Sequence, residues 1–324
     1  MEMKDIKIKR ISVLDSSIAA YNVGNRIIMD AVNEHLAEMF PNDFIIPLPM
    51  EDIKRNARRY AELSKMTFVG GTNVINCDIR KYRQWDLDFH NILILKRLVL
   101  LGVGWWRYED QPVTRYTKWA LKNILSKDYL HSVRDSYTQK RLSEIGIQSI
   151  NTGCPTLWNI TPSHVDMLRT KRKSKNVIIT ITDYDKNPAR DKKLIEICNK
   201  YYDNVYLFIQ GTGDCDYIRS LASTANLKII PPQIPKYNKI LEQCQCDYIG
   251  TRLHAGIRAL QKGVRSYILA IDNRSKEMGC DFGLPILEDT NLNELESIIN
   301  SKYELNLRIP YDNINKWKSQ FLKL

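Results

Sequence analysis

The chain has 324 residues, of which 44% are hydrophobic and 26% charged, and its formal net charge is +11. This length favours two domains, the composition is typical of a globular protein, and no apolar run is long enough to span a membrane. The positive charge indicates an anionic partner, for which nucleic acid, lipid headgroups and phosphorylated metabolites are the candidates.

In the first half of the chain, apolar runs typical of strands alternate with amphipathic runs typical of helices. The expected strands are residues 6–14, 44–48, 66–69, 98–102, 129–133 and 147–150, and the expected helices are residues 24–40, 119–125 and 137–144. A basic run at residues 169–175 follows. We interpret it as a solvated linker, with contact to an anionic membrane surface as the alternative.

The second half repeats this alternation. Its expected strands are residues 177–181, 205–209, 227–230, 246–249 and 264–271, and its expected helices are residues 191–201, 237–244 and 255–263. Such a rhythm predicts parallel sheets with right-handed crossovers. We therefore predict an α/β protein with two Rossmann-like domains facing a cleft, residues 1–168 and 176–305, and a C-terminal helix, residues 306–324, that crosses back to the first domain.

The seven cysteines are scattered and odd in number, which argues against a disulfide framework. Cys244 and Cys246 are too closely spaced for a usual zinc pair, so we expect no metal site. No signal-peptide core precedes the first expected strand. A cytoplasmic protein is therefore expected.

Four turns that follow expected strands carry the candidate site residues, because ligands of parallel sheets bind at the carboxyl ends of strands. The first is residues 22–25, for which a capped loop is the structural alternative, and the second is residues 70–73, either a tight turn or a binding loop. In the third, Arg134 ends a strand and precedes Asp135. A buried ion pair is the structural alternative there, and an arginine facing the cleft is favoured.

The fourth turn is Gly250-Thr251-Arg252-Leu253-His254, where a short strand leads into a helix. A helix start offers unpaired N–H groups and a positive dipole end, which favour phosphate or carboxylate. Arg252 adds a fork of donors suited to the same groups, and His254 exchanges protons readily near neutral pH. A lone histidine here would be a structural one, but Arg252 beside it favours a functional role. Lys276, after the next strand, supplies one more cation.

Together with Gly153-Cys154-Pro155, the order of these turns resembles that of the polysaccharide pyruvyl transferases, from about residue 12 to residue 280. Two positions depart from the family pattern: Asn25 stands where aspartate is usual, and Thr72 where a third glycine is frequent. The resemblance implies a two-domain fold like that of the GT-B glycosyltransferases. It also implies an enzyme of surface polysaccharide synthesis that transfers pyruvate from phosphoenolpyruvate to a sugar. The product is a ketal that bridges two hydroxyls of the sugar. Phosphoenolpyruvate is the co-substrate, and no cofactor is implied. For the sugar acceptor, a lipid-linked glycan, a nucleotide sugar and a finished polymer all remain open.

Phosphoenolpyruvate carries a phosphate and a carboxylate, so the resemblance implies Arg134 and Arg252 as clamps on the donor, assisted by the backbone N–H of Leu253. His254 is implied as the general acid or as a third donor to phosphate, and Lys276 as a contact to the donor or to a phosphorylated acceptor. The other residues expected at the substrate are Asn22, Gly24, Asn25, Gly70, Gly71, Asn73 and Asp135.

Two alternatives remain open at this point. A nucleotide-sugar-dependent glycosyltransferase would share the implied fold and the arginine-rich anion site. A non-enzymatic protein that binds nucleic acid or another anion is suggested only by the net charge. Because the basic residues are dispersed and no nucleic-acid module is recognised, no nucleic-acid partner is expected.

Overall fold

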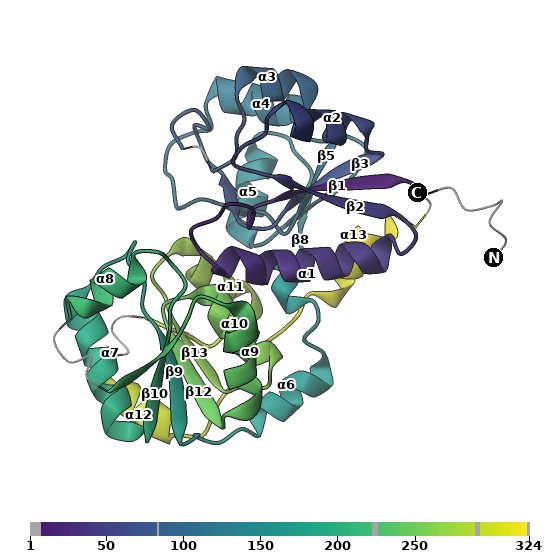
Figure 1. The fold of residues 1–324 in the computed structure, drawn as a ribbon. Helices are drawn as coiled ribbons and strands as arrows, with labels where there is room; N and C mark the ends of the chain where they lie inside the picture. The colour runs from purple at the N-terminus through teal and green to yellow at the C-terminus, as the bar shows by residue number, and fades with distance from the viewer. Residues whose placement is uncertain (1–7, 83, 222–225, 289–291, 323–324) are drawn as a thin grey trace. The chain divides into compact units, whose positions relative to one another are not determined.

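The computed structural model describes residues 8–82, 84–221, 226–288 and 292–322, so the start of the strand expected from residue 6 lies outside it. The chain divides into two compact units (Figure 1). Unit 1 comprises residues 1–20, 28–155 and 310–324, and unit 2 comprises residues 21–27 and 156–309.

Unit 1 is built on parallel strands. Its main sheet has the order β2-β1-β3-β5, with β1 (Arg10–Asp15), β2 (Phe44–Pro49), β3 (Met66–Gly70) and β5 (Leu98–Leu101). Two short parallel pairs complete it: β4 (Asn73–Ile75) with β6 (Gly104–Trp105), and β7 (His131–Val133) with β8 (Ser149–Asn151). β3 and β5 are buried along their whole length, which is the pattern of strands covered on both faces.

The helices of unit 1 are α1 (Gly24–Met39), which starts within the short segment assigned to unit 2, α2 (Arg55–Leu63), α3 (Phe89–Ile94), α4 (Arg115–Ile124), α5 (Ser136–Glu144) and α13 (Tyr311–Ser319). The last of these, α13, returns to unit 1 as the sequence predicts. Trp317 is fully buried, its ring lies 6.1 Å from that of Phe68, and its Nε1 donates to the carbonyl of Leu130 at 2.8 Å.

Unit 2 contains one six-stranded parallel sheet of order β11-β10-β9-β12-β13-β14. The strands are β9 (Asn176–Thr180), β10 (Asn204–Phe208), β11 (Leu227–Ile230), β12 (Cys246–Gly250), β13 (Ser266–Leu269) and β14 (Ile286–Leu287). The helices are α6 (Pro162–Arg169), α7 (Pro188–Tyr201), α8 (Asp214–Arg219), α9 (Ile234–Gln243), α10 (Leu253–Gln261), α11 (Asn273–Phe282) and α12 (Leu295–Asn300). This is the strand order of a doubly wound Rossmann fold, and the order reverses between β9 and β12. The prediction of an α/β protein with parallel sheets is confirmed.

The division into units differs from the boundaries read from the sequence. The change falls after Pro155 rather than after residue 168, because α6 is bonded into unit 2: His164 Nε2 lies 2.7 Å from the carbonyl of Leu260. Residues 21–27 also belong to unit 2, since Asn22 forms an antiparallel bridge with Gly211. Between α6 and β9 the basic run has no regular structure. None of the described helices is long and apolar enough to cross a membrane.

Candidate anion-binding site

In unit 2, Arg252 is placed by a close approach of two strands. Gly250 ends β12 next to Thr180, the last residue of β9; a Cβ on Gly250 would lie 2.2 Å from Thr180 Oγ1 and 2.6 Å from its backbone nitrogen. Only glycine fits there. The following backbone is tied to β9 as well, because Arg252 N donates to Thr180 Oγ1 at 3.2 Å. Arg252 therefore stands where the strand order of the sheet reverses, which is where such sheets bind ligands.

Two carboxylates hold the guanidinium of Arg252. Its Nη2 forms a very short ion pair with Asp214 and lies 3.4 Å from Asp183. The side chains of Arg252 and Asp214 are only 4% and 1% exposed. Both pairs use Nη2, and the buried Nε has no hydrogen-bond partner in the part of the chain that the structure describes. The guanidinium is thus fixed at one nitrogen and retains donor capacity in its fork.

Asp214, the first residue of α8, connects the turns that follow β9 and β10. Its Oδ2 accepts from the backbone N–H groups of Gln210 (3.1 Å) and Gly211 (2.8 Å), and its Oδ1 accepts from that of Asp183 (3.1 Å). Burial raises the pKa of this carboxyl above its ordinary value, while Arg252 and the donors oppose the rise. A Cβ on Gly211 would lie 2.7 Å from Arg252 Nη2, so glycine is needed beside the pair.

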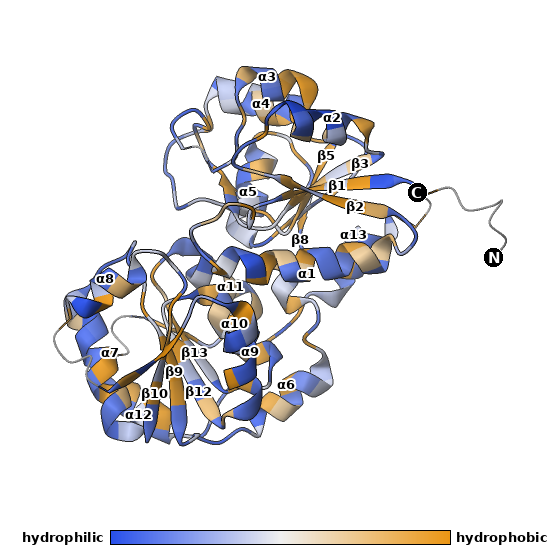
Figure 2. Cartoon of the chain, in the orientation of Figure 1, coloured by the Kyte–Doolittle hydropathy of each residue, from blue (hydrophilic) through white to orange (hydrophobic). Residues whose placement is uncertain are grey.

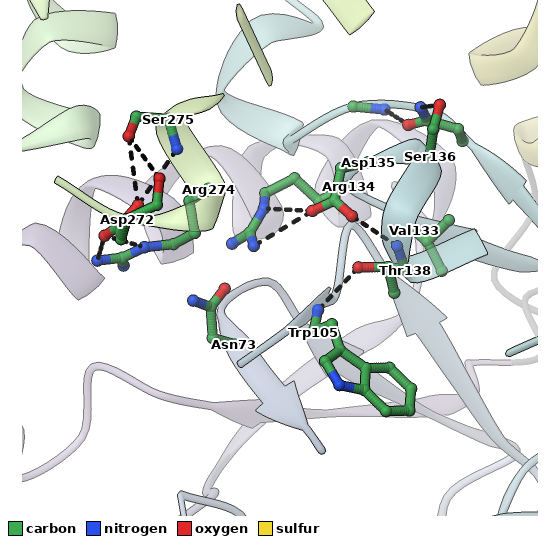
Figure 3. Close-up of polar contacts among 12 residues, drawn as sticks. Asn73, Trp105, Val133, Arg134, Asp135, Ser136, Thr138, Asp272, Arg274 and Ser275 are labelled. Carbon is green, nitrogen blue, oxygen red and sulfur yellow. Dashed lines mark hydrogen bonds and ion pairs between the residues drawn. The ribbon is translucent and has the colours of Figure 1, made fainter. Parts of the chain in front are cut away.

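A second arginine lies close to this group through Tyr184. The ring of Tyr184 is 5.0 Å from Arg252 Cζ, and its hydroxyl accepts from Arg274 Nη2 at 3.0 Å. Asp272 positions Arg274 by accepting from its Nε at 2.9 Å, and also caps α11 (Figure 3). Lys276, the cation chosen from the sequence, instead pairs with Glu288 at 3.3 Å.

His254 and Leu253 form the first turn of α10, and both are buried. The first intrahelical bond runs from Gly256 N to Arg252 O, so the N–H groups of residues 253–255 have no carbonyl within the helix to pair with. The hydroxyl of Tyr248 donates to Arg252 O at 2.8 Å and anchors the helix start. The buried start of α10 thus combines a cation, the N–H groups of a helix N-terminus and an imidazole, which suits a small anion.

The turn at residues 22–25 lies against the same part of unit 2. Besides the Asn22–Gly211 bridge, Val23 N donates to Gln210 O at 3.1 Å, and a Cβ on Gly24 would lie 3.0 Å from Gln210 Oε1. The capping bond comes from Asn22, whose Oδ1 accepts from Gly24 N at 2.8 Å. Asn25 does not cap α1, because the helix already begins at Gly24 and Asn25 lies in its first turn.

In unit 1, Arg134 follows β7 and is completely buried. Its guanidinium lies 3.4 Å from Asp135, which is equally buried and caps α5 by accepting from Thr138 N at 2.7 Å (Figure 3). The ion pair considered as the structural alternative is therefore present. Gly104 makes room for Arg134, since a Cβ there would lie 2.0 Å from Nη2.

The turn at residues 70–73 combines a tight conformation with one polar side chain. Gly71 has a φ of 49° and a Cβ on it would lie 2.2 Å from Ile28 Cγ2, so this glycine is needed for packing. Thr72 has a φ of 69°, a conformation that favours glycine. Asn73 pairs with Gly104, its Nδ2 donates to Trp106 O at 3.3 Å, and within the described residues its buried Oδ1 has no partner. Asn73 and Arg134 are thus both neighbours of Gly104.

Four residues around Arg252 were not predicted from the sequence: Asp183, Tyr184, Asp214 and Arg274. A usable signal existed for the first three. Asp183 and Tyr184 lie in the loop after β9, Asp214 begins the helix after β10, and the carboxyl ends of parallel strands meet at one edge of a sheet. Among the described residues, no group of three or more histidine, cysteine or acidic side chains is arranged to hold a metal ion.

The sequence model of the polysaccharide pyruvyl transferase family matches residues 22–273, which contain all the turns described above. The chain belongs to this family. Pyruvyl transfer in polysaccharide synthesis is therefore its activity at the level of the family, and the protein is an enzyme. No curated protein matches the chain by sequence.

Solved structures resemble this pyruvyl transferase in fold. The UDP-GlcNAc 2-epimerase of Methanocaldococcus jannaschii, solved with UDP-GlcNAc and UDP, has a TM-score of 0.54 at 11% identity and covers 97% of this chain and 98% of its own. The S. aureus MnaA structure with UDP has a TM-score of 0.55 at 10% identity and covers 98% of both chains. At such identities the likeness concerns the fold alone, which is GT-B-like as the sequence predicts.

Proposed function

We propose that this transferase takes its pyruvyl group from phosphoenolpyruvate and joins it to two hydroxyls of one sugar residue as a ketal. The observation that supports it best is the buried Arg252 at the start of α10, where the strand order reverses. Phosphoenolpyruvate is small and multiply anionic. Arg252, the helix N–H groups and Arg274 offer cationic and N–H donors of the kind that bind phosphate and carboxylate.

The chemistry needs a proton at one carbon and a nucleophile at its neighbour. Protonation of the methylene carbon C3 places positive charge on C2, which a sugar hydroxyl attacks while losing its own proton. The C2–O bond to phosphate then breaks and inorganic phosphate leaves. The second hydroxyl adds to C2 and releases its proton, for example to the departing phosphate, which closes the ketal. In this scheme His254 supplies the proton to C3 or donates to the leaving phosphate, Arg252 and the N–H of Leu253 stabilise the anionic groups, and Lys276 is a weaker contact.

The test measures phosphate release and acid-labile incorporation of radiolabelled pyruvate into a sugar acceptor. Arg252→Ala should lower kcat/KM by about 10²–10³-fold, the usual loss for a preorganised donor. His254→Gln should lower kcat by about 10²–10⁴-fold, and near-normal turnover would exclude its role as the acid. Lys262→Ala is the matched control, because Lys262 is a surface cation that pairs with Glu242 at the opposite end of the same helix.

The same assay tests whether Arg134 of unit 1 contacts the donor. Arg134→Lys keeps the positive charge but loses the planar fork. If Arg134 contacts the donor, the folded variant should lose kcat/KM strongly, and its thermal midpoint, measured in parallel, shows how much of the protein is folded at the assay temperature. Replacing phosphoenolpyruvate by UDP-sugars tests the other candidate activity. Glycosyl transfer from a UDP-sugar without pyruvate incorporation would show a nucleotide-sugar glycosyltransferase instead.

A further inference from the structure

Two packed helices of unit 1, α3 and α4, carry large apolar side chains in contact with solvent. Phe89 and Leu93 of α3 are 60% and 49% exposed, and Trp119 of α4 is 38% exposed. Phe89 and Leu93 are four residues apart and share one helix face. The rings of Phe89 and Trp119 are nearly parallel, with centroids 5.9 Å apart. These three side chains therefore form one surface, here called the α3–α4 patch.

Cations flank this patch along α4. Arg115 and Lys122 lie four residues before and three residues after Trp119, so they project on the same side of the helix. Lys118 is adjacent, and all three are exposed. A stripe that alternates cations with an aromatic ring is the composition of helices that lie in a membrane interface.

The positive charge continues onto α2 and the end of α3. Helices α2 and α4 together carry six basic side chains and one acidic side chain, Glu62. Arg58 of α2 donates to Asn91 of α3 at 2.7 Å, which ties the helices together, and Figure 2 shows the hydrophilic α2 next to the more hydrophobic α3. Beyond α3, three exposed cations line a cavity of about 260 Å³: Lys65, Lys96 and Arg97.

The chemistry of this surface favours an anionic lipid bilayer over other partners. A second copy of the chain in a two-fold contact would place the same cations against one another, which opposes association. Nucleic acid would explain the cations but not the exposed leucine and phenylalanine. A bilayer surface satisfies both, because its headgroups carry negative charge and its interface accepts aromatic and aliphatic side chains.

We propose that the α3–α4 patch and the cations of α4 dock unit 1 onto an anionic membrane surface. Phe89, Leu93 and Trp119 enter the headgroup region, and the α4 cations meet the lipid phosphates. This inference goes beyond the proposed ketal chemistry and does not depend on it. Docking of this kind would bring the enzyme to acceptors carried on lipid.

The experiment is co-sedimentation of the full chain with phosphatidylcholine vesicles that contain or lack phosphatidylglycerol, at about 0.15 M ionic strength. We expect binding only to the anionic vesicles, weakening with added salt. The variant Arg115→Glu/Lys118→Glu/Lys122→Glu should bind at least about 100-fold more weakly, given the usual contribution of each cation near an anionic surface. The matched control, Lys171→Glu/Arg172→Glu/Lys175→Glu, reverses as many exposed charges between α6 and β9 and should bind like the wild type.

A second measurement follows the aromatic ring itself. Vesicles with brominated acyl chains should quench part of the wild-type tryptophan fluorescence. The Trp119→Phe variant should bind with similar affinity but lose that quenching, which assigns the inserted ring. Circular dichroism and activity on a soluble sugar acceptor should be unchanged in all these variants, so loss of folding or of catalysis is separated from loss of docking.

Three results would overturn the proposal. The wild type would fail to bind anionic vesicles, the control variant would lose binding as much as the α4 variant, or binding would persist without any quenching by brominated lipid. A shift from dimer to monomer in the α4 variant, in the absence of vesicle binding, would identify the patch as a protein interface. If vesicle binding is as expected but no pyruvate is transferred, the docking stands and only the proposed function fails.

Discussion

Replacing Gly104 by alanine tests whether Arg134 is held in place by its fit against the backbone. The added Cβ would lie 2.0 Å from Nη2 and 2.4 Å from Cζ of Arg134. Carbon and nitrogen atoms normally stay about 3.5 Å apart, so the guanidinium must move by more than about 1 Å. Because Arg134 is fully buried and packed beside Asp135, it has no solvent into which it can swing.

The expected cost follows from two terms. Overpacking of a buried site costs about 1–3 kcal/mol. Moving the guanidinium also weakens its pair with Asp135, and full loss of a buried pair costs about 3–5 kcal/mol. We therefore expect Gly104→Ala to lower the free energy of unfolding of unit 1 by about 2–4 kcal/mol. If Arg134 contacts the donor, the same change also lowers kcat/KM without removing any side chain at the substrate.

The assay is a double-mutant cycle by urea unfolding with Gly104→Ala, Arg134→Ala and the combined variant. Tryptophan fluorescence reports mainly on unit 1, because only Trp158 of the tryptophans belongs to unit 2. Without the guanidinium, alanine at 104 should cost less than about 1 kcal/mol, which gives a coupling of about 2 kcal/mol. Equal costs in both backgrounds, within about 0.5 kcal/mol, would refute the steric account.

Three further predictions concern stability. Burial lowers the pKa of His131 to about 4, below the ordinary 6.5. Unit 1 should therefore be fully stable above about pH 6.5 and lose about 3 kcal/mol of its free energy of unfolding as the pH falls towards 4. In urea unfolding at several pH values, the free energy of unfolding of the His131→Gln variant should depend less steeply on pH. Trp317→Ala, which removes a buried ring and the bond to Leu130, should lower the stability of unit 1 by about 3–5 kcal/mol in urea unfolding. Gly250→Ala places a Cβ 2.6 Å from the backbone of Thr180 and should lower the thermal midpoint more than Gly104→Ala, whose neighbour is a side chain.

Each of these three predictions has an outcome that would contradict it. A pH dependence that is the same in the His131 variant would assign the acid sensitivity to other groups. A Trp317 variant with normal stability would mean that α13 contributes little to the core. A mild effect of Gly250→Ala would show that β9 and β12 can separate.

The fold and the position of Arg252 in it could be predicted because they depend on local patterns. The alternating apolar runs predicted the parallel strands. Because Arg252 follows β12 closely in the chain, it was expected at the carboxyl edge of a sheet. The strand-to-helix turn also placed His254 at the start of a helix expected from residue 255; in the structure the helix begins at Leu253 and includes His254.

The partners of the two arginines could not be predicted in the same way. Asp214 is 38 residues from Arg252, and their pairing depends on β10, β9 and β12 being adjacent in an order that the pattern of strands alone leaves open. The role of Gly104 was not predicted, because it depends on Arg134, thirty residues later in the chain. That Arg274 reaches Tyr184 while Lys276 pairs with Glu288 could not be predicted either, since only side-chain contacts distinguish two cations on one helix turn.

Neither unit is a continuous stretch of chain, and this affects how the protein is made on the ribosome. Residues 21–27 emerge early but cannot bond to Gln210 and Gly211 until all of the intervening chain, including most of unit 1, has been translated. The aromatic core around Phe68 likewise stays uncovered until Trp317 has been added. Nascent chains are thus exposed to chaperones or aggregation throughout elongation, and cutting the gene at a single point will not yield either half as an autonomous folding module.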